Sequence, residues 1–355
     1  MELQRPDLSE SSPAVRLYIE ALEAEVERLR PRRRKHTTRM RTNVDDIILE
    51  PILEPDEPPT TMGVITLSAA GVGKRSLRHL YSRQRRSGMG IFDLETTEKD
   101  PPKRLAVINE HETLLLISNF ARAYHLPISK LEASPVRHTG RNLSKFLILD
   151  RGEHISLIVP NPMSGALVIT TQTGQVQRYQ HHRFRSTMRP GMLLYSLAKF
   201  GSPVAACQTT GEDDIFLVTR NRRAIRFAEE QIPLTGCPGI RLKDDDTIAG
   251  IAAVRENSGV FLLGADGKGI IRLMEGFRPN KAPGASGKIA MKSPQIVGVT
   301  TVDPTDDLFI ISRLSKIIRF AAAEVPNKLG VVQGVNCISL RGDEAVAVAA
   351  GRVIR

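Results

Sequence analysis

The chain has 355 residues, and its 50 Lys and Arg against 39 Asp and Glu give a formal net charge of +11 and a pI near 9.8. That length suits one large all-β domain or two ordinary domains, and the positive excess indicates a polyanionic partner or an anionic membrane surface. No apolar run approaches the roughly 18 residues that a membrane span needs, and the N-terminus lacks a signal-peptide pattern. Three widely spaced cysteines without a CxxC pair argue against a disulfide framework or a zinc site, and they favour free thiols in a reducing cytoplasm.

The first predicted element is a short amphipathic helix within an N-terminal tail, residues 1–30. Ser12 and Pro13 form a helix start, and Pro31 ends the helix. Apolar residues recur between them at alternating steps of four and three, as in a coiled-coil seam: Val15, Ile19, Leu22, Val26 and Leu29. Two heptads are marginal alone, so the helix either docks on its own domain or pairs with a second copy or another partner.

A linker is predicted over residues 31–60. Its first part belongs to the basic tract RPRRRKHTTRMR (30–41), which either lies along phosphates or is solvated. Its second part, VDDIILEPILEPDEPP (44–59), is acidic and proline-rich, and is interpreted as a tether that competes with nearby basic surface. Within it, IILEPIL could add an edge strand.

From residue 61 to residue 355 the chain repeats. Each unit has an apolar strand, a polar turn, and a second strand with an arginine near its end, followed after a dozen or more residues by glycine and then by another apolar run. The aligned arginines are Arg75, Arg122, Arg178, Arg226, Arg272 and Arg319. The glycines are Gly88 and Gly90, Gly140, Gly191, Gly239, Gly287 and Gly334.

The period predicts an all-β fold, a six-bladed β-propeller. Units of about 48 residues with roughly four short strands each are typical of a closed radial repeat. Helical repeats of similar length are excluded by the alternating Val, Ile, Thr and Phe and by the frequent Gly and Pro. Radial closure also protects strand edges that a single repeated sheet would leave exposed.

The repeated arginines are expected to face solvent on the rim of the disc, where they and neighbouring cations would contact phosphates of a bent duplex. The alternative is a solvated face of a basic protein. The predicted rim contacts are Lys74, Arg75, Arg122, Arg178, Arg222, Arg223, Arg226, Lys268, Arg272, Lys316 and Arg319. Further cations lie near the glycines: Arg137, Arg141, Lys145, Arg183, Arg185, Arg189, Arg241, Lys243, Lys288 and Lys292. Because Trp is absent and Tyr numbers only five, duplex backbone is favoured over stacking on single strands.

No enzymatic site is apparent in the sequence. SAAGVGKRS resembles a phosphate loop, but Ser68 stands where the first glycine is required, so a hairpin is favoured. His181 and His182 are adjacent and would point to opposite faces of a strand, which argues against a shared metal. No catalytic residue, metal or cofactor is therefore expected.

The stretch YSRQRRSGMG (81–90), ahead of five further units, resembles the C-terminal domain of bacterial DNA gyrase A over about residues 50 to 355. That family carries a box, Q-R-R-G-G-K-G, on its first blade and folds as a six-bladed β-pinwheel that wraps DNA around its rim. The matching box is Gln84, Arg85, Arg86, Ser87, Gly88, Met89 and Gly90, with Ser87 in place of a glycine and Met89 in place of the lysine. The resemblance implies DNA contact by the box, weakened by the lost lysine and by a serine where glycine moves freely.

The family's winged-helix domain with its catalytic tyrosine has no counterpart ahead of this region. The resemblance therefore implies a free-standing, non-catalytic protein that binds double-stranded DNA on the nucleoid in the cytoplasm. One alternative is an accessory component of a split type II topoisomerase, bound to a catalytic partner through the N-terminal helix. The other is a propeller that serves as a scaffold for protein partners.

Overall fold

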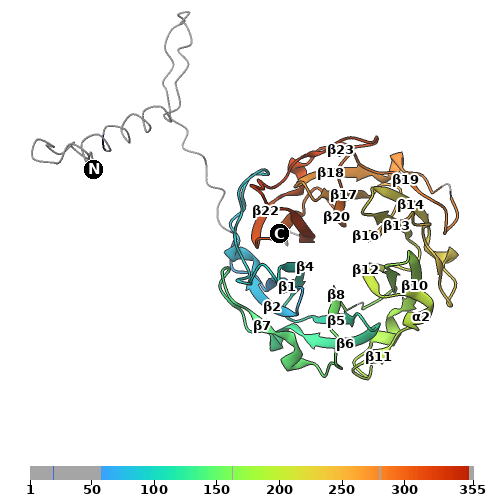
Figure 1. Ribbon diagram of the computed structural model, residues 1–355, viewed down its shortest axis with the longest axis horizontal. Coiled ribbons are helices and arrows are strands. Elements are labelled where there is room, and N and C mark those ends of the chain that lie inside the picture. Colours follow the sequence, from blue (N-terminus) through green and yellow to red (C-terminus); the bar gives the residue numbers. More distant parts are fainter. Residues whose placement is uncertain (1–18, 20–56, 162, 280, 352–355) are drawn as a thin grey trace, which may run out of the picture. The chain divides into compact units, whose positions relative to one another are not determined.

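A computed structural model describes Ile19 and residues 57–161, 163–279 and 281–351. The repeating part of the chain forms six small sheets, antiparallel except for one short parallel strand, arranged as blades around a ring (Figure 1). The predicted six-bladed β-propeller is confirmed. The predicted N-terminal helix, apart from Ile19, and linker residues 31–56, including the possible edge strand IILEPIL, lie outside the described residues.

Each blade is built on a hairpin. The six hairpins are β1 (Met62–Ser68) with β2 (Val72–Leu77), β5 (Thr113–Ser118) with β6 (Arg122–Pro127), β9 (Ala166–Thr171) with β10 (Gln175–Gln180), β13 (Asp214–Thr219) with β14 (Arg223–Ala228), β17 (Gly259–Gly264) with β18 (Lys268–Leu273), and β21 (Asp307–Ser312) with β22 (Lys316–Ala321). The blades are numbered 1 to 6 in this order.

A third strand of each blade lies toward the centre of the ring and pairs with the first hairpin strand (Figure 1). These inner strands are β4 (Pro102–Asn109), β8 (Ile155–Pro160), β12 (Pro203–Thr209), β16 (Ile248–Val254), β20 (Ile296–Val302) and β25 (Ala345–Gly351). Each hairpin is followed by a 3-10 turn: η1 (Arg78–Leu80), η2 (Ile128–Lys130), η4 (His181–Phe184), η5 (Glu229–Gln231), η6 (Met274–Gly276) and η7 (Ala322–Glu324). The remaining turns are η3 (Leu143–Phe146) and α2 (Leu197–Phe200).

The outer strand of every blade comes from the next unit around the ring. These two-residue strands are β3 (Ile91–Phe92), β7 (Arg141–Asn142), β11 (Met192–Leu193), β15 (Cys237–Pro238), β19 (Lys288–Ile289) and β24 (Val335–Asn336). Thus β7 of the second unit pairs with β2. We call the junction between blade 6 and blade 1 the seam, and β3 of the first unit crosses it to pair with β22 of blade 6. A further strand, β23 (Asn327–Lys328), runs parallel to β18. Exchange of β3 closes the ring.

A glycine directly precedes each outer strand, and in the first unit it is Gly90, the last residue of the box. The six residues, Gly90, Gly140, Gly191, Gly236, Gly287 and Gly334, have φ between 67° and 89°. A Cβ on Gly90 would lie 2.7 Å from the carbonyl oxygen of Ile317 in blade 6. Glycine therefore combines a left-handed backbone with close approach to the preceding blade. In the fourth unit this position belongs to Gly236 and not, as the spacing suggested, to Gly239.

The core lies between blades. One buried cluster joins Phe261 and Leu263 of β17 to Leu308 and Ile310 of β21, and another joins Ile65 of β1 to Leu114 of β5. A hairpin strand packed on both faces has few exposed positions, which explains why β21 is buried at all six residues. Among the described residues, no helix is long and apolar enough to cross a membrane.

Candidate nucleic-acid interface

The repeated arginine does not face solvent in most blades. Arg75, Arg226 and Arg319, each the fourth residue of a second hairpin strand, expose only 8%, 3% and 4% of their surface. The prediction that these side chains line the rim is wrong, because the neighbouring blade covers the face on which they lie.

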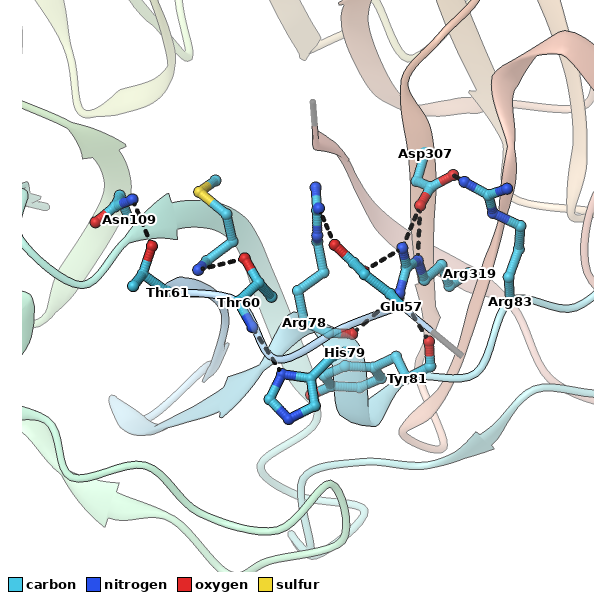
Figure 2. Close-up of polar contacts among 11 residues, drawn as sticks. Glu57, Thr60, Thr61, Arg78, His79, Tyr81, Arg83, Asn109, Asp307 and Arg319 are labelled. Carbon is cyan, nitrogen blue, oxygen red and sulfur yellow. Dashed lines mark hydrogen bonds and ion pairs between the residues drawn. The ribbon is translucent and has the colours of Figure 1, made fainter. Parts of the chain in front are cut away.

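Arg319 joins blade 6 to blade 1 (Figure 2). Its Nε donates to Oδ2 of the fully buried Asp307 at 2.7 Å, and its Nη1 donates to the carbonyl oxygens of Arg78 and Tyr81 at 3.2 and 3.1 Å. Its Nη2 lies 2.6 Å from Oε2 of Glu57, whose other oxygen accepts from Arg78. We call this group of residues the seam clamp.

Two further contacts extend the seam clamp. Arg83, three residues from the end of η1, lies 2.8 Å from Oδ1 of Asp307. Burial raises the pKa of Glu57, but the hydrogen bonds and charges of Arg78 and Arg319 outweigh it and hold that pKa below its ordinary value of 4.5. Glu57 is therefore ionised at neutral pH and bridges arginines of two blades.

Arg226 makes the same connection between blades 4 and 5. Its Nε donates to Asp214 at 2.8 Å, and its Nη1 donates to the carbonyl oxygens of Met274 and Phe277 at 2.9 and 3.3 Å. Asp214, like Asp307, is the first residue of its hairpin. Arg178 reaches Glu229 of η5 in the following blade at 3.8 Å. Arg178, Arg226 and Arg319 thus connect blades, whereas the side chain of Arg75 pairs with Glu110 of its own unit at 3.4 Å.

Two of the aligned arginines are out of register with the others. In β6 the fourth residue is His125, and Arg122 is the first. In β18 the fourth residue is Ile271, so Arg272 lies on the opposite face of the strand. Its guanidinium packs 5.8 Å from the centre of the Phe277 ring, and the residue as a whole is 4% exposed. The rim prediction is therefore also wrong for Arg272.

Lys74, another predicted phosphate contact, is 3% exposed. Its Nζ lies 2.7 Å from Oδ1 of the fully buried Asp93, and it donates to Ser76 and Tyr81 at 2.7 and 3.1 Å. Burial lowers the pKa of Lys74, and burial beside Asp93 raises the pKa of Tyr81 well above its ordinary value. Because Asp93 directly follows β3, this network anchors the strand that closes the ring.

The remaining predicted rim cations are half-buried and lie beside the outer strands. Four are the first residue of a second hairpin strand and stand opposite an outer-strand residue: Arg122, Arg223, Lys268 and Lys316. Arg122 pairs with Asp150 and Glu153, and Arg223 donates to carbonyl oxygens of Ser286 and Gly287. Arg222 lies in the preceding turn with φ of 69°. These side chains border the rim while helping to hold it together.

The box lies across the seam, against blades 5 and 6. The amide of Gln84 donates to the carbonyl oxygen of Arg319 at 2.8 Å, and the amide of Ser87 donates to that of Cys337 at 2.9 Å. Between them a turn is closed by Gly88 N–H to Arg85 C=O at 3.2 Å. Ser87 has φ of 70° there, so this serine does occupy a left-handed position that glycine adopts more readily.

The two box arginines differ. Arg85 is exposed, whereas Arg86 is half-buried: its amide donates to Glu324 at 2.9 Å and its Nη1 to the carbonyl oxygen of Asn336 at 3.3 Å. Ser87 Oγ also donates to Asn336, at 2.8 Å. The box therefore presents Arg85 to solvent on a turn that Arg86 and Ser87 fasten to the neighbouring blades.

Comparison with known proteins agrees with this geometry. The family model described as "DNA gyrase C-terminal domain, beta-propeller" matches residues 64–100, 213–255 and 306–350. The chain is 29% identical over 294 residues to the DNA gyrase A protein of Ureaplasma parvum, covering 80% of this chain and 35% of that protein. It is 28% identical over 315 residues to the DNA gyrase A protein of Staphylococcus aureus (strain MRSA252), covering 85% and 36%. The predicted resemblance is confirmed.

Solved structures show the same fold. The gyrase A C-terminal domain superposes with a TM-score of 0.72 at 21% identity, over 81% of this chain and 99% of that one. The C-terminal domain of DNA topoisomerase IV superposes with a TM-score of 0.58 at 17% identity, over 83% and 95%. The chain spans about a third of the length of the curated gyrase A relatives it matches.

Part of the exposed positive charge of the propeller lies in the segments around its outer strands, while other exposed cations, such as Arg255 and Arg313, lie elsewhere. The exposed cations near the outer strands are Arg85, Arg137, Arg141, Lys145, Arg183, Arg185, Arg189, Arg241, Lys243, Lys288 and Lys292. We call these residues the outer band. Arg137 and Arg141 pair with Glu95 and Glu132, each at 2.5 Å, and Arg183 and Arg189 line a groove beside β11. In the sequence, the residues of the outer band are marked by their proximity to the repeated glycines and not by the repeated arginine of the hairpins.

Proposed function

We propose that the propeller binds duplex DNA without sequence preference and bends it around the outer band. The main supporting observation is that exposed cations recur next to outer strands of successive blades, while the hairpin arginines are used inside the ring. Phosphate contacts of this kind tolerate any sequence, and many of them together offset the cost of bending. The relationship to gyrase A supports the same function.

The first prediction concerns salt. Contact with about six phosphates implies a slope of log K against log salt concentration near −5, from roughly 0.9 per phosphate. Fluorescence anisotropy with a labelled duplex of mixed sequence, at several salt concentrations, measures it. A slope near zero, or tight binding that persists in molar salt, contradicts phosphate contact by the outer band.

The second prediction concerns the altered box. Met89 is 56% exposed, so Met89→Lys adds a cation without burying it and restores the lysine of the family's box. The salt slope should become steeper by about 0.9 and affinity should rise. Met89→Gln is the matched control, since it adds polarity without charge. Equal slopes for the two variants place residue 89 away from the phosphates.

We further propose that the protein acts on DNA topology together with a catalytic partner and does not cleave DNA by itself. This proposal is supported by similarity to about one third of gyrase A. Circular DNA relaxed by a nicking-closing enzyme in its presence should acquire a changed linking number. A protein that binds DNA but leaves the linking number unchanged is not a wrapping protein.

A further inference from the structure

One exposed aromatic side chain lies on the strand that closes the ring. Among the phenylalanines and tyrosines that the structure describes, only Phe92 is exposed, at 54%. Its neighbours Met89 and Ile91 are 56% and 38% exposed. Phosphates do not bind such a surface, so its position beside the box requires another explanation.

Two cations lie close to the Phe92 ring. Lys316 Nζ lies 5.7 Å from the ring centre, and the guanidinium carbon of Arg137 lies 5.9 Å from it. Lys316 is in blade 6, and Arg137 belongs to the outer-strand segment of the second unit. Positive charge from two different units thus lies close to an apolar side chain. This combination complements DNA, in which phosphates lie near apolar base faces.

The backbone that carries Phe92 is held rigidly. Phe92 pairs with Lys316 across β3 and β22, and the next amide, of Asp93, donates to the carbonyl oxygen of Ser315 at 2.9 Å. The Asp93 side chain is fully buried against Lys74. A side chain that separates stacked bases must be carried by a rigid backbone, because otherwise it would fold back onto the protein.

We propose that Phe92 is an apolar wedge that enters a base step of the bound duplex from the minor groove. This inference rests on the proposed DNA binding and specifies where the bend is made. Architectural proteins kink DNA by inserting apolar side chains between base pairs, while cations hold the flanking phosphates. Flexible pyrimidine–purine steps such as TA unstack most easily, so the wedge should prefer them.

The test compares full-length wild-type protein with Phe92→Ala, Phe92→Lys and Leu193→Ala. Leu193 is the matched control because it is 57% exposed on the outer strand β11. Duplexes carry 2-aminopurine at a central TA step, and its fluorescence reports unstacking. Wild-type protein and Leu193→Ala should both increase the fluorescence, whereas Phe92→Ala should not, and its affinity should fall about fivefold or more. Its salt slope should stay unchanged, because no charge is lost.

Phe92→Lys separates a wedge from simple charge. It should steepen the salt slope by about 0.9 and still abolish the fluorescence increase. The wedge is overturned if Phe92→Ala retains the wild-type fluorescence and affinity, as expected of a surface that docks a protein. Wild-type protein that binds the duplex without any fluorescence change overturns the wedge alone. Absence of binding overturns the proposed function as well.

Discussion

Replacing Arg319 by methionine should destabilise the propeller by about 3–5 kcal/mol, the range for breaking a buried ion pair by removing one partner. Asp307 would stay fully buried after losing its 2.6 Å contact with Arg319. The carbonyl oxygens of Arg78 and Tyr81 would lose their donor as well. Chemical denaturation followed by far-ultraviolet circular dichroism measures the loss.

Arg226→Met is the matched control, since Arg226 makes the same contacts between blades 4 and 5. We expect a similar loss of stability from both variants. The strands that unfold locally first should differ between them. Hydrogen exchange should accelerate first in β3 and β22 for Arg319→Met, and in β14 and η6 for Arg226→Met. If Arg319→Met is as stable as wild type but binds DNA more weakly, Arg319 is a rim contact after all and the seam clamp is not structural.

Replacing Arg85 and Arg86 together by alanine should remove most of the linking-number change, more than the loss of two charges elsewhere. The box crosses the seam, so it can define where the DNA path begins or ends, and Arg86 also holds the turn through Asn336. Arg222 and Arg223 are a poor control, because Arg223 bonds carbonyl oxygens of the next unit and Arg222 has a positive φ.

The better control is the double variant of Arg185 and Arg189, both exposed in the outer-strand segment of the third unit. The Arg185 and Arg189 variant should lower the salt slope by about 1.8, from roughly 0.9 per phosphate, and the box variant by about 0.9, because Arg85 is exposed whereas Arg86 is bonded to Asn336. Only the box variant should lose most of the linking-number change in the nicking-closing assay. If the two double variants lose the same share of the linking-number change, the box arginines act only as charges, like the other residues of the outer band.

Local pattern was enough to predict the propeller. Alternating apolar residues define the hairpins, polar turns separate them, and one period runs through six units. Glycine before the outer strand is also a local signal, because its left-handed backbone is a property of the residue itself. The box was recognisable for the same reason: its residues are contiguous.

Contacts between residues distant in the chain could not be predicted in this way. Arg319 is 241 residues from Arg78, and Lys316 pairs with Phe92, so neither contact leaves a periodic trace. Register was equally hidden: a shift of one residue places Arg272 on the opposite face from Arg226, although both end an apolar run.

The sequence by itself determined the number of blades, the hairpins, the glycine turns of five of the six units and the overall positive charge, because each depends on neighbouring residues or on composition. Only the tertiary structure decided which cations reach solvent. Strand alternation places Arg226 and Arg319 on a face that is exposed in an isolated hairpin. Packing of the next blade then buries that face and supplies carboxylates and carbonyl oxygens as partners. Exposure depends on what covers a side chain, and here the covering residues come from another unit of the ring.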